Sequence, residues 1–222
     1  MEKAIILVSG GLDSCVTAAC AQEAGFNLAF LHLNYGQKTE ARELKAFKDI
    51  VDHYSVSEVL SVSMSHLVKI GGSCLTDTSI DVPKANLDNL DIPISYVPFR
   101  NANMISVAVS WAEVIKASHI FIGAVEEDSS GYPDCRRDFF DAFEKMIVEG
   151  TRPETDIKLE TPLIHLDKSQ IISKGKVLNA PMHLTWSCYQ SEKIPCGECD
   201  SCALRARGFE KAGIIDPILE WS

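Results

Sequence analysis

The sequence predicts an α/β fold in which helices cover both faces of a parallel sheet. Apolar runs, such as residues 4–8 and 28–33, alternate along the chain with amphipathic stretches. Strands that are apolar on both faces and separated by helices are typical of a buried parallel sheet. A glycine-rich turn follows the first run directly, as in α/β folds that bind ligands at the ends of their strands. We therefore expect a Rossmann-like sheet.

The individual elements follow from local patterns. Strands are predicted at residues 4–8, 28–35, 58–64 and 119–123. Helices are predicted at residues 13–24, where Gly25 can end the helix, and at 38–54, 100–117, 134–149 and 167–178, with a helix-like stretch over 200–211. Residues 69–98 contain Gly71, Gly72 and three prolines with little periodicity, which indicates loops and short turns.

The length and a shift in composition predict the domain organisation. A chain of 222 residues fits one domain, or one domain with a small appendage, because domains average roughly 100–200 residues. From about Thr185 the sequence becomes rich in cysteine, glycine and charged residues. We expect an α/β domain over residues 1–184 and a C-terminal metal-binding segment, residues 185–222, packed on the same domain.

Composition and charge exclude several classes of function. A net charge of −10 disfavours a nucleic-acid partner, because such proteins neutralise phosphates with clustered Lys and Arg. No apolar run approaches the roughly 20 residues of a membrane span, and the start of the chain has no signal-peptide pattern. These features predict a cytoplasmic protein. In a reducing compartment, eight cysteines indicate metal binding or catalysis rather than disulfides.

The turn after the first strand is a candidate phosphate site. It reads Ser-Gly-Gly-Leu-Asp-Ser over residues 9–14 and runs into a helix. Backbone N–H groups in such a turn, together with a helix N-terminus, attract an anion. The alternative is an ordinary turn with a helix cap, but its position in an α/β fold favours phosphate. Neither G-x-x-x-x-G-K-[ST] nor G-x-G-x-x-G is present at this turn.

The run over residues 9–14 resembles the SGGxDS signature of the PP-loop ATP pyrophosphatases, which share the adenine nucleotide alpha hydrolase-like fold. In that superfamily the loop holds the β,γ-pyrophosphate of ATP while an acyl or amide oxygen attacks the α-phosphorus. For Asp13 two readings stay open, a contact to Mg²⁺ on the pyrophosphate and a helix cap. The resemblance implies ATP contacts from Val8, Ser9, Gly10, Gly11, Leu12, Asp13, Ser14, Cys15, Val16, Thr17 and Ala18.

Four cysteines near the end of the chain form a second motif. Cys188, Cys196, Cys199 and Cys202 have the spacing C-x7-C-x2-C-x2-C, which suits a tetrahedral structural Zn²⁺ site. A [4Fe–4S] cluster and four unrelated buried cysteines are the alternatives. Zinc is favoured because a helix-like stretch follows the ligands and no redox partner site is evident. Of the other cysteines, Cys135 lies within a further motif and the remaining three are expected to pack in the core.

Several runs resemble the 7-cyano-7-deazaguanine synthases of queuosine-precursor biosynthesis. They are LNYGQK at 33–38, VPFRN at 97–101, SGYPDCR at 130–136, LTWSCY at 184–189, CGECDSC at 196–202 and RGF at 207–209. The resemblance implies a ligase that converts 7-carboxy-7-deazaguanine and ammonia into the nitrile, activating first the acid and then the amide with ATP. It also implies a homodimer and assigns the zinc to the four clustered cysteines.

Substrate contacts are expected from the charged and aromatic residues of these runs. A carboxylate can accept the paired N–H donors of a deazaguanine edge, for which Asp134 and Glu127 are candidates. Tyr132 is a candidate for stacking on the base. Lys38, Arg100 and Arg136, with Asp134, are the catalytic candidates, the cations by neutralising the carboxylate or the phosphates. Residues 125–129 depart from the family pattern, and the six histidines are expected to be structural or exposed.

Three other functions share parts of this pattern. A tRNA-thiolating PP-loop enzyme would need a basic surface and a sulfur-carrying cysteine, which the acidic charge disfavours. A nucleotide-binding module without turnover would release no pyrophosphate. A relative that acts on a protein or on a different acceptor would share the same motifs.

Overall fold

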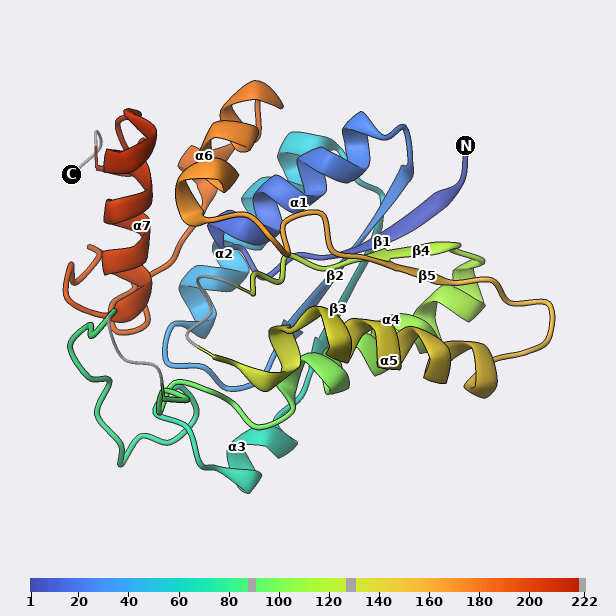
Figure 1. Cartoon of the computed structure of the whole chain (residues 1–222), viewed down its shortest axis with the longest axis horizontal. Coiled ribbons are helices and arrows are strands. Elements are labelled where there is room, and N and C mark those ends of the chain that lie inside the picture. The colour runs from blue at the N-terminus through green and yellow to red at the C-terminus, as the bar shows by residue number, and fades with distance from the viewer. Residues whose placement is uncertain (88–90, 127–130, 220–222) are drawn as a thin grey trace.

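The computed structural model describes residues 1–87, 91–126 and 131–219, and it contains one parallel sheet with the strand order β3-β2-β1-β4-β5 (Figure 1). The strands are β1 (Lys3–Leu7), β2 (Asn27–Asn34), β3 (Glu58–Ser63), β4 (His119–Phe121) and β5 (Lys158–Glu160). The expected Rossmann-like α/β class is confirmed. β1 lies at the centre, and the chain runs outward from it in both directions.

The helices form a layer on each face of the sheet (Figure 1). α1 (Leu12–Glu23), α2 (Glu40–Tyr54) and α6 (Lys168–Val177) cover one face, and α4 (Arg100–Ile115) and α5 (Arg137–Gly150) cover the other. α3 (His66–Ile70) is a single turn, and α7 (Asp200–Ala212) packs against α6.

β1 illustrates why the predicted strands are continuously apolar. Ile6 packs with Phe30 and the helices of the first layer, whereas Ile5 packs with Leu31 and the helices of the second. Both faces of the strand are buried, so every position favours an apolar side chain.

Three local features differ from the sequence-based expectation. β5 was not expected, because the short edge strand Lys-Leu-Glu carries one apolar residue and shows no recognisable period. β3 alternates between more and less buried residues, as an edge strand does, rather than being apolar on both faces. The helix expected from residue 134 begins at Arg137, because Pro133–Cys135 form a 3-10 turn and Arg136 has an extended backbone.

The C-terminal segment is tied to the sheet domain at two places. The Trp186 backbone N–H donates to the carbonyl oxygen of Gly10 at 2.9 Å. The Thr39 hydroxyl, just before α2, is within hydrogen-bond distance of the Cys188 backbone oxygen, at 3.2 Å. Within the segment itself, Arg205 is buried, holds Asp216 through two hydrogen bonds of 2.6 and 2.8 Å, and donates to Thr185 at 2.8 Å.

Across the described residues, none of the helices combines the length and the apolar character that a membrane span requires.

Candidate active site

A cavity of about 290 Å³ opens beyond the carboxyl end of β1. Its wall combines the loop after β1, the first turns of α1, α2 and α4, and the segment from Trp186 to Arg205. The chain leaves β1 toward β2 on one side and later returns to β4 on the other. Ligands of open α/β sheets bind at such a reversal of strand order.

The loop after β1 has the geometry of an anion site. Gly10 has a φ of +92°, and a Cβ atom there would lie 2.5 Å from the backbone oxygen of Glu43. Only glycine therefore fits between the loop and α2. The Ser9 and Ser14 hydroxyl oxygens are 3.1 Å apart, and the Gly11 N–H donates to Ser9 Oγ at 3.2 Å. Two hydroxyl groups thus stand beside the N-terminus of α1.

Apart from Gly10, which packs against α2, the ATP contacts expected from residues 8–18 fall into two groups. Six of these residues line the cavity, namely Val8, Ser9, Gly11, Leu12, Asp13 and Ser14. The residues further along α1 face the protein interior, since Cys15, Val16 and Ala18 belong to the core and Thr17 donates to the backbone oxygen of Asp13 at 2.8 Å.

Lys168 is a cation at this loop that sequence reasoning missed. Its ammonium group contacts both carboxylate oxygens of Asp13, at 2.7 and 2.8 Å, and both residues line the cavity. Lys168 is the first residue of α6, which Asp167 and Gln170 cap reciprocally. This capping box marks the helix start in the sequence. The pairing with residue 13 spans 155 positions, and no local pattern predicts it.

The other end of the cavity combines Arg100 with tyrosines. Arg100 Nη1 donates to the Tyr35 hydroxyl at 3.0 Å, and its guanidinium carbon lies 5.1 Å from the centre of that ring. Tyr132 and Tyr189 also line the cavity. Burial raises the pKa of Tyr35 to about 12, so its hydroxyl remains neutral beside the cation. A positive charge among aromatic rings suits a planar anion.

The remaining sequence candidates occupy different places. Among the described residues, Arg100 and Tyr132 line the cavity, whereas Asp134, Lys38 and Arg136 are outside the lining. Lys38 donates to the Ile80 backbone oxygen at 2.8 Å, and Arg136 is exposed. Glu127, the other candidate for the guanine edge, lies outside the described residues.

Asp134 serves α4 in this structure. Its carboxylate is 3% exposed and accepts the Asn101 backbone N–H at 2.9 Å, in the first turn of that helix. The Asn101 side chain returns a 2.8 Å hydrogen bond to the Asp134 backbone oxygen. Burial raises the pKa of Asp134, although the N–H donor and Arg100 oppose this. The carboxylate is thus turned to the first turn of α4 and lies outside the cavity lining.

Glu43 is a further cavity residue that sequence reasoning missed. It lies in the first turn of α2 and lines the cavity, and its backbone oxygen packs against Gly10. Thr39 and Gln37 donate to its carboxylate at 2.8 and 3.0 Å. The sequence does not indicate a site role for Glu43, because an acidic residue early in a helix usually complements the helix dipole.

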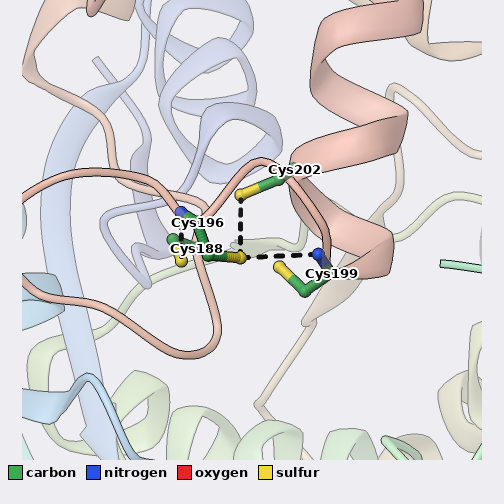
Figure 2. A group of neighbouring side chains, drawn as sticks. All are labelled: Cys188, Cys196, Cys199 and Cys202. Atoms are coloured by element: carbon green, nitrogen blue, oxygen red, sulfur yellow. Dashed lines mark hydrogen bonds between the residues drawn. The ribbon is translucent and has the colours of Figure 1, made fainter. Parts of the chain in front are cut away.

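Four cysteines come together beside the cavity (Figure 2). The sulfurs of Cys188, Cys196, Cys199 and Cys202 all lie within 4.8 Å of one another, and those of Cys196 and Cys202 are 3.9 Å apart. Tetrahedral zinc with Zn–S bonds of about 2.3 Å places its sulfurs about 3.8 Å apart. The Cys196 backbone N–H points at Cys188 Sγ from 3.3 Å, which stabilises a thiolate. The cluster therefore fits a metal ion.

The fold resembles solved structures of distant proteins. A 4-thiouridine synthetase, solved with RNA and ATP, aligns with a TM-score of 0.51 at 19% identity, over 99% of this chain and 52% of that one. A predicted tRNA methyltransferase subunit from Methanocaldococcus jannaschii aligns with a TM-score of 0.50 at 16% identity, over 79% of this chain and 75% of the other. At these identities the likeness concerns the fold alone.

Sequence relatives are much closer. A 7-cyano-7-deazaguanine synthase from Chlorobium phaeobacteroides is 59% identical over 97% of this chain and 96% of its own. One from Chlorobium chlorochromatii is 60% identical over 97% of this chain and 95% of its own. The model of the family described as queuosine biosynthesis protein QueC matches residues 3–213. The resemblance found in the sequence motifs is confirmed, and the chain belongs to the QueC family.

Proposed function

We propose that the protein is an ATP-dependent ligase that converts 7-carboxy-7-deazaguanine and ammonia into 7-cyano-7-deazaguanine. The observation that carries the proposal is the two-ended cavity, with an anion-binding loop at one end and Arg100 among tyrosines at the other. Relatives at 59% and 60% identity carry the name of this synthase. An enzyme that joins ATP to an aromatic acid needs both ends in one cavity.

Each end then has a binding role. The loop, with Ser9, Gly11 and Ser14, holds the β,γ-pyrophosphate, and Lys168 adds a positive charge to it. Arg100 pairs with the substrate carboxylate, and Tyr132 packs against the planar ring. For Mg²⁺ carried by ATP, Asp13 is the available carboxylate, and it would release Lys168 to take that role.

The chemistry uses ATP twice. A carboxylate oxygen attacks the α-phosphorus, and pyrophosphate leaves. Ammonia then attacks the acyl carbon, the nitrogen loses a proton, and AMP leaves with the electron pair of the C–O bond. The amide oxygen attacks the α-phosphorus of a second ATP, and pyrophosphate leaves. AMP then departs with the electron pair of its C–O bond, and loss of the two remaining N–H protons gives the nitrile. Alignment of ATP with the acid supplies much of the acceleration, since a positioned pair reacts as one molecule.

Asp134 has a structural place in this proposal. Asp134→Asn keeps an oxygen that can accept from Asn101, so we expect KM for the acid within about threefold of the parent and a stability loss of about 1 kcal/mol. Steady-state kinetics and thermal unfolding measure the two effects. A large rise in KM with unchanged stability would instead support the hypothesis that Asp134 accepts the N–H donors of the deazaguanine edge.

The four cysteines are proposed to hold zinc in a structural role. Four thiolates complete a tetrahedral shell and leave no position for a substrate, so bound zinc would hold the cavity wall in place. Elemental analysis of the purified protein tests this, and iron with visible absorption would contradict it. We further propose a homodimer, as the family resemblance implies, and a cytoplasmic location, which suits eight cysteines that form no disulfide with one another.

Pyrophosphate release tests the function directly. The protein is mixed with ATP, the carboxy-deazaguanine and ammonia, and release is compared with that in mixtures lacking one component. Release that depends on the acid, with the nitrile identified by mass spectrometry, supports the ligase. No release would point to a nucleotide-binding module. Tight, salt-sensitive binding of tRNA in a filter assay would instead favour a tRNA-modifying enzyme.

A further inference from the structure

Glu43 is a cavity carboxylate that the ATP and acid contacts proposed above leave without a role. Three described acids line the cavity, namely Asp13, Glu43 and Asp200. Lys168 neutralises Asp13, and Asp200 accepts the Asn86 N–H at 3.2 Å, as the first residue of α7. Glu43 differs from Asp13 because its hydrogen-bond donors, Thr39 and Gln37, are both neutral.

Two neighbours fix the orientation of the Glu43 carboxylate. Gln37 Oε1 accepts the Tyr35 backbone N–H at 3.0 Å, so its amide nitrogen must point toward Glu43 Oε2. The Thr39 hydroxyl lies 2.8 Å from Glu43 Oε1 and 3.2 Å from the Cys188 backbone oxygen. Each carboxylate oxygen has two lone pairs, so each can still accept another proton.

Glu43 is in contact with the loop after β1 and is linked through Gln37 to Tyr35. On one side its backbone oxygen is the atom that a Cβ at Gly10 would meet at 2.5 Å, which places the residue against the phosphate loop. On the other side Gln37 links its carboxylate to the backbone N–H of Tyr35. The hydroxyl of the same tyrosine accepts a hydrogen bond from Arg100. ATP on the loop and an acid at Arg100 would meet in this region.

We propose that Glu43 is the general base that takes the proton from nitrogen when ammonia attacks the activated acid. This role rests on the proposed function. A C–N bond forms between ammonia and the acyl carbon, and one N–H bond breaks as its proton passes to a Glu43 oxygen. The C–O bond to AMP then breaks, and AMP leaves with the electron pair. The proton is released to solvent before the next cycle.

The surroundings of Glu43 suit a proton acceptor. Burial raises its pKa, and the hydrogen bonds from Thr39 and Gln37 partly oppose that shift. The charged groups that face it are Arg100 on α4, which lowers the pKa, and Glu40 on its own helix, which raises it. A carboxylate with a raised pKa is a stronger base than one at the surface.

The test separates adenylate formation from the attack of ammonia. Glu43→Gln keeps the shape of the side chain, and its amide can accept from Gln37 and donate to Thr39, whose own proton can pass to the Cys188 oxygen. The acid-dependent exchange of labelled pyrophosphate into ATP needs no base, so we expect it within about threefold of the parent. Amide formation with ammonia should fall about 100-fold, within the range for a lost general base.

Two further readouts exclude a merely structural effect. Hydroxylamine has a less basic nitrogen whose adduct loses its proton readily, so hydroxamate formation should survive in Glu43→Gln. At fixed free ammonia, the parent rate should fall as pH drops through the Glu43 pKa, and the variant should be insensitive there. Glu40→Gln, which removes the neighbouring charge outside the cavity lining, is the matched control and should keep amide formation within about threefold.

The outcomes are distinguishable. Loss of pyrophosphate exchange in Glu43→Gln in parallel with amide formation, or full retention of amide formation, would overturn this role. If the parent protein itself shows no acid-dependent exchange, the proposed function fails first. If Glu43→Gln does not fold, Glu43→Asp withdraws the carboxylate by one methylene and should give the same separation between the two steps.

Discussion

The loop after β1, residues 8–11, and the cysteine segment, residues 186–205, form neighbouring parts of one cavity wall, but different forces hold them. The loop is anchored by β1, whose residues Ile5 and Ile6 are fully buried, and by the packing of Gly10 against α2. The cysteine segment has little regular structure before α7, and its four cysteine sulfurs lie within 4.8 Å of one another (Figure 2). The core should therefore preserve the loop when the metal site is lost. In turn, the metal site should survive when the loop is distorted.

The largest expected effect comes from breaking the metal site. Cys199 is the N-cap residue of α7, and serine is a favourable cap. Cys199→Ser therefore removes a metal ligand without weakening the start of the helix. We expect loss of bound metal, loss of ligase activity by more than about 100-fold, and a marked drop in the melting temperature, because structural zinc contributes on the order of 10 kcal/mol in small domains. Elemental analysis, kinetics and calorimetry measure these.

The control for that change is Cys20→Ser, a half-buried cysteine on α1 outside the cluster. It should keep the metal and the activity. If Cys20→Ser lost as much activity and stability as Cys199→Ser, the losses could not be assigned to the metal site.

A substitution in the loop should impair pyrophosphate exchange and leave the metal site intact. Gly10→Val places a side chain against the Glu43 backbone oxygen at a positive φ, so the loop must move. We expect acid-dependent pyrophosphate exchange to fall about 100-fold while the metal stays bound. Gly25→Ala is the matched control, with a φ of +82° but open space around its Cβ, and should cost only about 1 kcal/mol of stability. Loss of metal in Gly10→Val would show that the two regions are not independent.

A smaller effect is expected from Lys168, which approaches the loop from α6. Lys168→Met keeps the length of the side chain and removes its charge, leaving Asp13 without its cation. We expect KM for ATP to rise about tenfold, or about 1.4 kcal/mol, with less change in KM for the acid. An equal rise for both substrates would place Lys168 between the two ends rather than at the phosphates.

The smallest effect concerns the link between α6 and α7. Asp167 caps α6 and also holds Lys211 of α7 at 2.7 Å. Hydrogen bonds from Lys211, Ser169 and the Gln170 backbone lower the pKa of Asp167. The stabilisation by this carboxylate is therefore present above the unfolded-state pKa near 3.9 and is lost as pH falls toward the folded value. Asp167→Ala should cost about 1 kcal/mol at pH 7 and much less at pH 2, as chemical denaturation at the two pH values would show. A pH-independent cost would assign the effect to packing.

The sequence predicts local motifs well and long-range pairings poorly. The run over residues 9–14 and the spacing of the four cysteines each lie within a short stretch, so their chemistry can be recognised directly. The pair of Asp13 and Lys168 depends on where α6 returns to the sheet. The placement of Glu43 beside Gly10 likewise depends on how α2 packs. Tertiary packing alone decides both.

Asp134 and β5 show two further limits of sequence reasoning. A conspicuous motif indicates that Asp134 matters, but whether its carboxylate faces a ligand or the backbone of α4 depends on the orientation of a 3-10 turn. β5 has three residues and is defined by pairing with β4, which no property of its own sequence specifies. Pattern reasoning fails where the partner, rather than the segment, determines the structure.

The hydrogen bond from Trp186 to Gly10 joins two segments that are distant in the sequence. Strands β1 and β2 and the loop after β1 are synthesised before the cysteine segment, and the cavity wall is not complete until Arg205 and its partner Asp216 have followed. A nascent chain therefore holds the loop without the wall that encloses it. On the proposed function, we expect ATP turnover only from chains whose synthesis has passed the cysteine segment.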